Sequence, residues 1–389
     1  MRRRAILTVT ATVLTVGLTG ARAAEPPAAP AAPARAEPRA VQVDTPGRAL
    51  PAGGFDFAVP QTVAAGLAAP WGLDFLPDGS ALVTQRDLGT VVRVRPGRTP
   101  RQVAAIDGVV AGGEAGLLGL AVSPHHRRDR LVYVCFTTAI DLRIVRFRLD
   151  APQRQEVILS GVARAGAHDG GRLAFGPDGL LYVGVGDAGV PTRAQDLSSR
   201  NGKILRIRPD GTVPPGNPFP GSPVYSWGHR NVEGLAWDGD GRLFATEFGQ
   251  NTWDEVNRIV PGGNYGWPIV EGPSTDPRFR SPVVTWRPAE ASPSGAAFAN
   301  GTLFVAALRG ARLWTVPVDA SGTVGTPTPE LVGEYGRLRT VAVAPDGSLW
   351  VTTSNRDGRG RPAGDDDRVL RFTPGVPQPA AFSGVRGSR

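Results

Sequence analysis

A pattern of apolar runs on both sides of a tight turn is repeated six times along this chain of 389 residues. The turns recur roughly every 50 residues, which is the period of propeller blades with long loops. A lone blade cannot bury both of its faces, so such repeats must stack into one domain. The pattern predicts an all-β fold, a six-bladed β-propeller. The six turns are Pro77-Asp78-Gly79, Ser123-Pro124-His125, Pro177-Asp178-Gly179, Asp238-Gly239-Asp240, Ala299-Asn300-Gly301 and Pro345-Asp346-Gly347.

Each repeat divides into four short strands, several of which show the period-two alternation of half-buried strands. The first strand ends before the turn and the second follows it, as in Leu117–Val122 and Leu131–Thr137. The sixth repeat lacks a fourth strand because the pattern ends at Phe372. Residues Phe55–Ala65 can supply that strand. We therefore expect four-stranded antiparallel blades, closed into a ring by an N-terminal strand.

The N-terminus has the three parts of a signal peptide. Arg2–Arg4 are basic, Ala5–Gly20 are apolar, and Ala21-Arg22-Ala23 is a small-residue cleavage site. The apolar run is short for a stable membrane span, and no lipobox cysteine follows it. We expect a secreted or periplasmic protein, exported by the Sec or the twin-arginine route. The expected organisation is a signal peptide at 1–23, an Ala/Pro-rich disordered linker at 24–54, the propeller at 55–375 and a flexible tail at 376–389.

The net charge gives no support for a nucleic-acid-binding protein, and the single cysteine indicates a fold without an internal disulfide. The formal net charge is +8, but residues 1–23 carry four arginines and no acid, which leaves about +4 for the rest. No Lys/Arg cluster stands out, so we expect no nucleic-acid partner. Cys135 is the only cysteine and lies in an apolar strand pattern, which indicates an inert core thiol.

Unusual polar residues gather in two sets of loops. In an antiparallel blade, alternate connections emerge at opposite ends. The loops that lead into first strands and those that join second to third strands therefore share one face, opposite the turns. This convergence predicts a site on the axis, although propeller rims are polar in any case. The residues concerned are Glu114, His168, Asp169, Asp187, Arg230, Asn231, the segment 247–255, Trp286, Arg309, Arg337 and Arg339.

His168 and three arginines suggest the chemistry of this face. A histidine beside two glycines suits a general base, because its ordinary pKa lies near neutrality, but a structural histidine is the alternative. Arg230, Arg337 and Arg339 are expected to point inward. Arginines crowded near an axis would hold a polycarboxylate ligand through their fork-shaped guanidinium groups. The alternative is pairing with Glu114, Glu247 or Asp187.

The segment 247–255 combines carboxylates with glycine and asparagine, and Tyr265 follows it. Carboxylates with free backbone carbonyls form a hard-cation site that favours Ca²⁺. No His/Cys cluster suggests zinc.

At these motifs the chain resembles the soluble pyrroloquinoline quinone (PQQ)-dependent glucose/sorbosone and aldose sugar dehydrogenases, over roughly residues 60–373. The resemblance implies that an aldose sugar is oxidised at its anomeric carbon to a lactone, with hydride transfer to PQQ, calcium assistance and an electron acceptor that the sequence does not identify. Six ordered motifs on six blades make the signal specific. They are Gly113–Gly119, His168–Leu173, Asn201–Arg206, Gly228–Asn231, Asp254–Asn257 and Asn264–Pro268.

The resemblance also implies roles for single residues. His168 would be the base, and Arg230 would hold negative charge on the quinone oxygen with Asn231 beside it. The carbonyls of Gly249 and Gln250 would bind one calcium ion, and Glu255 and Tyr265 would bind calcium in the aldose-dehydrogenase branch. The expected cofactor contacts are Glu114, Arg230, Asn231, Trp286, Arg309, Arg337 and Arg339.

The chain departs from the family at several positions. Glu114 replaces a common Gln, Ala167 replaces an Asp, and Arg309 stands roughly where a Lys contacts the cofactor. The Gln250 loop lacks its usual proline, and insertions between Pro268 and Trp286 are missing. These departures favour an open site with a broad aldose range. They also keep a non-catalytic exported propeller that binds carbohydrate or a protein partner as the alternative, with a calcium-dependent lactonase ranked last.

Overall fold

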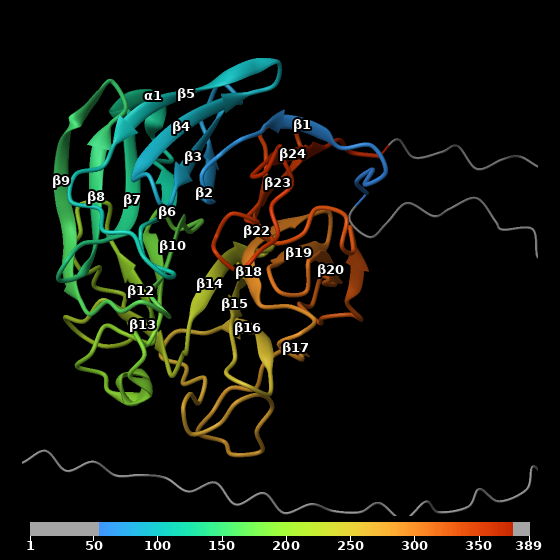
Figure 1. The fold of residues 1–389 in the computed structure, drawn as a ribbon. Helices are drawn as coiled ribbons and strands as arrows, with labels where there is room; N and C mark the ends of the chain where they lie inside the picture. Colours follow the sequence, from blue (N-terminus) through green and yellow to red (C-terminus); the bar gives the residue numbers. More distant parts are fainter. Residues whose placement is uncertain (1–53, 376–389) are drawn as a thin grey trace, which may run out of the picture. The chain divides into compact units, whose positions relative to one another are not determined.

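The computed structural model describes residues 54–375. Within them, six four-stranded antiparallel sheets stand around a central axis (Figure 1). The predicted six-bladed β-propeller is confirmed. The proposed signal peptide, nearly all of the proposed linker and the proposed tail lie outside the described residues.

The first strands line the axis, and neighbouring first strands contact each other around the ring. They are β2 (Pro70–Phe75), β6 (Leu117–Val122), β10 (Gly170–Phe175), β14 (Val232–Trp237), β18 (Pro293–Ala299) and β22 (Leu338–Val343). The second strands are β3 (Ala81–Gln85), β7 (Leu131–Thr137), β11 (Leu181–Val185), β15 (Leu243–Glu247), β19 (Thr302–Ala307) and β23 (Leu349–Thr353).

The two outer positions of the blades complete the sheets. The third strands are β4 (Thr90–Arg95), β8 (Leu142–Arg148), β12 (Lys203–Ile207), β16 (Asp254–Ile259), β20 (Arg312–Pro317) and β24 (Val369–Phe372). The fourth strands are β5 (Arg98–Ala105), β9 (Ala151–Val162), β13 (Val224–Trp227), β17 (Val284–Trp286), β21 (Thr328–Glu330) and β1 (Gln61–Ala64). Two short helices, α1 (His126–Asp129) and the 3₁₀ helix η1 (Pro191–Gln195), interrupt the loops.

The ring closes through the N-terminal strand, as the sequence predicts. β1 pairs antiparallel with β24, with Gln61 opposite Arg371, and so completes the blade built from β22, β23 and β24. The regular strand is shorter than the predicted Phe55–Ala65, because Phe55 makes only an isolated bridge to Pro374. Closure pairs the two ends of the described chain and leaves no gap between the first and last blades.

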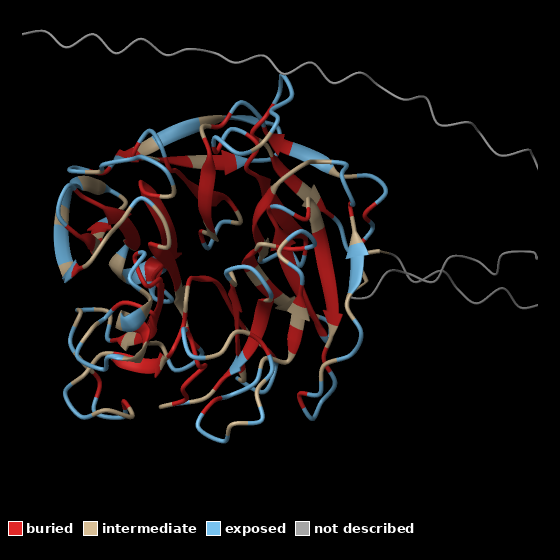
Figure 2. Ribbon diagram, turned by 60° about the horizontal axis from the view of Figure 1, so that its bottom comes forward, coloured by how far each residue is buried: buried red, intermediate tan, exposed pale blue. Residues whose placement is uncertain are grey.

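Burial decreases from the axis to the rim. All residues of β6 are buried, whereas most of β5 is exposed (Figure 2). Apolar clusters fill the spaces between neighbouring blades, as where Leu73 and Val83 of the first blade meet Trp350 of the last. Cys135 is fully buried in such a cluster, where burial raises the pKa of its thiol, in agreement with an inert core residue.

Asp-Gly turns set one face of the ring. In the first blade the Asp78 carboxylate accepts hydrogen bonds from the backbone N–H and the hydroxyl of Ser80, and Gly79 has φ +79°. Asp346 and Ser348 repeat this arrangement in the last blade. Aspartate bonds its own turn and glycine accepts the left-handed conformation, so this sequence suits a tight turn. The loops with the unusual polar residues emerge at the other face. Across residues 54–375, no helix is long and apolar enough to cross a membrane.

Candidate active site

A cavity of about 400 Å³ opens among the loops opposite the turns, and we name it the loop-face cavity. It is built from the two loop sets that the sequence singled out. Its lining includes seven of the predicted site residues: Glu114, His168, Arg230, Gly249, Gln250, Arg309 and Arg337. The remaining lining residues are Phe248, Asp254, Pro288, Ser292, Leu308 and Arg359.

His168 is oriented by a buried carboxylate. Its Nδ1 lies 2.8 Å from Oδ1 of Asp187, and Oδ2 of Asp187 accepts a hydrogen bond of 2.9 Å from the Trp267 indole. Burial raises the pKa of Asp187, but the hydrogen bonds from His168 and Trp267 outweigh this effect. The net pKa of Asp187 is therefore below its ordinary value. An ionised Asp187 makes His168 Nδ1 the donor and leaves Nε2 as the basic nitrogen.

The backbone around His168 is constrained by close contacts. His168 has φ +58°, a left-handed conformation that costs about 1–3 kcal/mol outside glycine. A Cβ on Gly186 would lie 1.9 Å from the His168 carbonyl oxygen, so only glycine lets the end of β11 approach this loop. Strain held by close packing is common where a side chain must point into a site.

Glu114 connects the base to the opposite side of the cavity. Its Oε2 accepts the backbone N–H of His168 at 2.7 Å, and its Oε1 accepts Nη1 of Arg359 at 2.8 Å. Burial raises the pKa of Glu114, but these two bonds lower it to a net value below the ordinary range. The carboxylate is therefore charged, and it ties the loop before β6 to the loop between β23 and β24.

The arginines differ in depth. Arg337 lines the cavity and pairs with Asp357 at 2.9 Å. Arg339 is not among the lining residues; it is 5% exposed and pairs with Glu233 at 3.0 Å. That Arg339 contacts the cofactor stays a prediction. Its side chain is neutralised by a buried carboxylate that the sequence analysis did not consider.

Arg230 keeps its guanidinium at the cavity wall. Its Nη1 donates to the Phe248 carbonyl at 3.3 Å, its backbone N–H donates to Glu247, and its guanidinium lies 5.4 Å from the Trp267 ring centre. Burial lowers the pKa of Arg230, and its Nε has no hydrogen-bond partner among the described residues. The protein therefore leaves this buried donor unsatisfied.

Two further residues expected to contact the cofactor lie behind the lining. Asn231 is fully buried and donates to Glu233 at 3.3 Å, while its Oδ1 has no partner among the described residues. Trp286 stacks on Trp314 with ring centres 5.2 Å apart and belongs to the core. The indole is used in packing between strands rather than at the cavity surface.

The loop between β15 and β16 wraps around a carboxylate. Oε1 of Glu271 accepts the backbone N–H groups of the four residues 250–253 at 2.8–3.1 Å. Burial raises the pKa of Glu271, but these four bonds lower it to a net value below the ordinary range. Asp254 accepts the N–H of Gly249 at 2.9 Å, and burial raises its pKa to about 6. Both carboxylates hold the loop that carries Gly249 and Gln250.

Glu255 and Tyr265 do not share a site through their side chains. The Tyr265 hydroxyl donates to the Arg258 carbonyl at 2.7 Å and accepts the Val260 N–H at 2.9 Å. Glu255 is buried opposite Glu247 on the paired strands β15 and β16. Burial, followed by the charge of Glu247, raises the pKa of Glu255 to about 8. Two buried carboxylates side by side would be stabilised by a cation, to which Tyr265 could offer only its backbone carbonyl.

Two residues of the site, Arg359 and Glu271, were not predicted from the sequence. Arg359 stands among several arginines in a Gly-rich loop, and Glu271 follows the Asn264–Pro268 motif without a motif of its own. Arg359 could have been predicted, because its loop joins a second strand to a third strand and such loops lie on the face of the site. Nothing in the sequence places Glu271 under the 250–253 loop.

The chain is similar to several known proteins. The PQQ-bound aldose sugar dehydrogenase of Streptomyces coelicolor has 51% sequence identity and a TM-score of 0.78, over 80% of this chain and 96% of that chain. An uncharacterized protein of Synechocystis is 34% identical over 347 residues, which cover 76% of this chain and 83% of that protein. An aldose sugar dehydrogenase of Escherichia coli is 27% identical over 335 residues, which cover 74% of this chain and 88% of that protein.

One family matches most of the propeller. The match to the Glucose / Sorbosone dehydrogenase family extends over residues 67–362 and so includes every lining residue of the loop-face cavity. Together with its six blades and the relatives above, this match shows that the chain belongs to the glucose/sorbosone dehydrogenase family.

Proposed function

We propose that this protein is a PQQ- and calcium-dependent aldose dehydrogenase that oxidises the anomeric carbon of aldoses to lactones. The observation that carries the proposal is the meeting, in one cavity, of an oriented base with a set of arginines. His168 presents Nε2 as a base, while Arg230, Arg309, Arg337 and Arg359 line the same space.

The residues present fit PQQ, which carries three carboxylates. The cavity is lined by four arginines but by only two carboxylates, those of Glu114 and Asp254. Burial raises the pKa of Asp254 to about 6. Arg309 is exposed and forms no ion pair among the described residues, and the Nε of Arg230 lacks a partner. An anionic ligand would satisfy these charges. When bound, PQQ supplies the quinone that accepts a hydride from the sugar.

The chain's own residues perform the proton chemistry. Nε2 of His168 takes the proton of the anomeric hydroxyl as the C1–H bond breaks, so the sugar loses one proton and one hydride and becomes a lactone. Asp187 stabilises the imidazolium that forms, and its bond to Trp267 fixes the ring in one orientation. Arg230 is placed to stabilise negative charge that develops at the acceptor oxygen.

Calcium is proposed at two places. The Gly249–Gln250 loop would offer backbone carbonyls at the cavity, where Glu271 and Asp254 fix the loop. Glu247 of β15 and Glu255 of β16 would offer their carboxylates, and a cation there would favour the ionised form of Glu255. Tyr265 fits this second set only through its carbonyl. We also propose export to the periplasm or the medium, directed by residues 1–23.

Reconstitution with PQQ and calcium tests the proposal. Purified protein should bind PQQ, seen as a cofactor absorbance that changes on adding sugar, and should reduce a redox dye with several aldoses. An Arg337→Gln variant should bind PQQ more weakly, whereas Arg148→Gln, at an exposed pair on the outer part of a blade, should not. PQQ binding without dye reduction would favour the non-catalytic alternative, and failure to bind PQQ would reject the proposal.

A further inference from the structure

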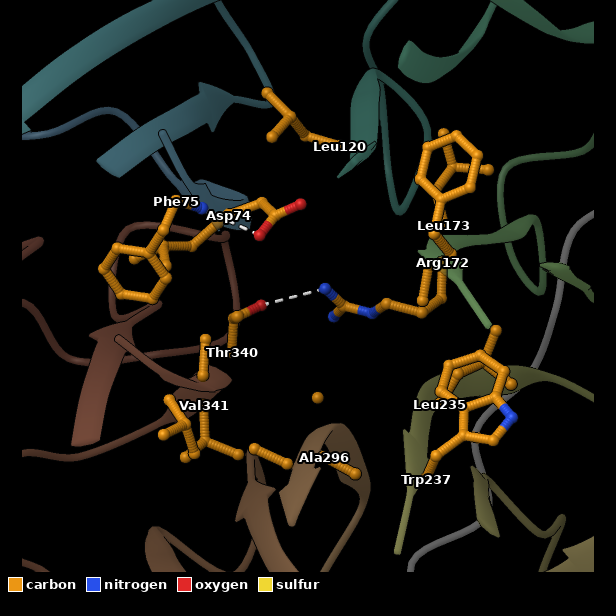
Figure 3. Close-up of a pocket in the computed structure, with 17 residues that line it drawn as sticks. Asp74, Phe75, Leu120, Arg172, Leu173, Leu235, Trp237, Ala296, Thr340 and Val341 are labelled. Carbon is orange, nitrogen blue, oxygen red and sulfur yellow. Dashed lines mark hydrogen bonds between the residues drawn. The ribbon is translucent and has the colours of Figure 1, made fainter. Parts of the chain in front are cut away.

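A second cavity lies on the propeller axis, and we name it the axial cavity. It has a volume of about 290 Å³ and is lined by the first strands of all six blades. It shares no lining residue with the loop-face cavity. Figure 3 shows it with the Arg172 side chain reaching from β10 into its centre toward Thr340. The family resemblance assigns no role to this space.

Arg172 has an unused donor in this cavity. The residue is 7% exposed. Its Nε donates to the Glu233 carbonyl at 2.6 Å, its Nη1 donates to the Thr340 hydroxyl at 3.1 Å, and its guanidinium lies 4.1 Å from the Trp71 ring centre. Its Nη2 is buried and has no hydrogen-bond partner among the described residues. A buried donor left without an acceptor costs about 1–3 kcal/mol, so the site favours an occupant that accepts this bond.

The charge of Arg172 is also without a direct ion pair among the described residues. Burial lowers its pKa to about 9, so the guanidinium remains charged at neutral pH. Asp74 is the one carboxylate in the lining of the axial cavity, and its oxygens accept the N–H groups of Phe75 and Val122, each at 2.7 Å. The Glu233 carboxylate favours the charged form of Arg172 from a distance, but its direct ion pair, at 3.0 Å, is with Arg339. A neutral acceptor such as water would satisfy the Nη2 donor but not this charge.

We propose that the axial cavity binds a small monovalent anion of the chloride class at Nη2 of Arg172. One unsatisfied N–H donor on a guanidinium without a direct ion pair among the described residues suits a single-atom or similarly small monoanion. A divalent oxyanion needs several donors, which the mainly apolar and backbone lining does not offer. The proposed anion site lies in a cavity separate from the one proposed for sugar oxidation.

The test uses halides and the intact protein. Thermal unfolding is followed at pH 7.5 as sodium gluconate is replaced by sodium chloride at constant ionic strength. The melting temperature should rise and saturate, because the anion binds the folded state. Arg172→Gln should abolish the rise, and Arg148→Gln, at an exposed pair, should keep it. Sulfate should not reproduce the rise at the same ionic strength.

Asp74→Asn should strengthen chloride binding, whereas Arg172→Gln should abolish it. At pH 7.5 the Asp74 carboxyl, whose pKa burial raises to about 6, is ionised and repels an anion. Its neutral replacement should lower the chloride concentration at half-saturation severalfold, and this value is independent of the variant's own stability. Crystals soaked in bromide should show an anomalous peak beside Nη2 of Arg172. Absence of that peak, or a chloride response that is equal in the wild type and Arg172→Gln, would overturn the proposal.

Discussion

The imidazole of His168 can act as a base only while its Nδ1–H is bound to Asp187, because that bond selects the tautomer with a basic Nε2. His168→Gln keeps a polar side chain of similar length but cannot take a proton. We expect turnover to fall about 10²–10⁴-fold, the usual contribution of a positioned base. Dye reduction measures turnover, and a PQQ absorbance titration should show unchanged cofactor binding. Near-normal turnover would mean that another group removes the proton.

Asp187 is expected to act through His168, so it is a positioning residue. Asp187→Asn should lower kcat about 10³-fold with little change in KM, because the amide favours the wrong tautomer. Trp267→Phe is the matched control, since it removes one hydrogen bond to Asp187 but keeps an aromatic ring below Arg230. We expect that control to cost less than about tenfold. An equal loss in both variants would indicate a general collapse of the loop rather than an effect on the tautomer.

At the scale of single residues, the sequence predicted which loops carry the site but not how deep each side chain lies. His168, Arg230 and Arg337 line the cavity as expected, whereas Arg339 is buried in an ion pair with Glu233. Arg337 precedes β22, and Arg339 lies within it. The exact start of the strand therefore decides which arginine lies in the loop, and the sequence pattern does not fix that start. Buried partners such as Glu233 come from other blades, so no local pattern reveals them.

At the scale of elements, the loop between β15 and β16 depends on Glu271. Glu271→Gln keeps an acceptor but removes the charge, and hydrogen bonds to charged groups contribute about twice as much as neutral ones. We expect faster amide exchange at residues 250–253 and weaker calcium activation. Glu290→Gln is the control, because Glu290 is an exposed carboxylate that accepts one backbone N–H in a neighbouring loop. Unchanged exchange rates in Glu271→Gln would show that the loop is held by other contacts.

Lys203 joins η1 to β12, and it is the only lysine in the chain. Its fully buried ammonium donates to the carbonyls of Arg193, Ala194 and Asn201 at 2.7–3.1 Å. Burial lowers its pKa to about 8, against about 10.4 in an unfolded chain. Between these values the unfolded chain binds more protons, so this group makes the free energy of unfolding rise with pH.

Melting temperatures of the wild type and Lys203→Met, compared from pH 7 to pH 11, test this linkage. The wild type should gain stability relative to Lys203→Met above pH 8, and the gain should level off near pH 10.4. Other titrating groups are common to both proteins and cancel in the comparison. Lys203→Arg should be destabilising although it keeps the charge, since the planar fork does not fit a site built for a compact ammonium. A constant difference across this range would show that Lys203 keeps its ordinary pKa.

The strands themselves were largely predictable. The predicted strands Leu117–Val122 and Leu131–Thr137 coincide with β6 and β7, because apolar alternation and turn chemistry are local properties. η1 escaped prediction, because it has no apolar period and depends on the buried Lys203. β9 runs over twelve residues from Ala151 to Val162, because an exposed outer strand can lengthen through backbone pairing without apolar side chains.

At the scale of the whole molecule, the ring is one cooperative unit, since every blade buries apolar residues against its neighbours and β1 joins the last blade. A ligand that binds only the folded ring therefore stabilises all of it. Calcium at 100 times its dissociation constant would add about 2.7 kcal/mol, which raises the melting temperature of a roughly 300-residue domain by about 4 °C. We expect chelation to lower the melting temperature and calcium to restore it better than magnesium, which gives up its waters reluctantly.

The Glu247–Glu255 pair decides where that calcium acts. Glu255→Gln removes the carboxylate whose burial beside Glu247 is costly, so the metal-free protein should keep or gain stability while its response to calcium shrinks. Asn257→Asp adds a carboxylate beside the pair and should make the metal-free protein less stable and its calcium response larger. Melting curves of each variant with chelator and with added calcium give both quantities. If metal-free wild type and Glu255→Gln respond equally to calcium, the stabilising ion binds elsewhere, and the Gly249–Gln250 loop becomes the remaining proposed site.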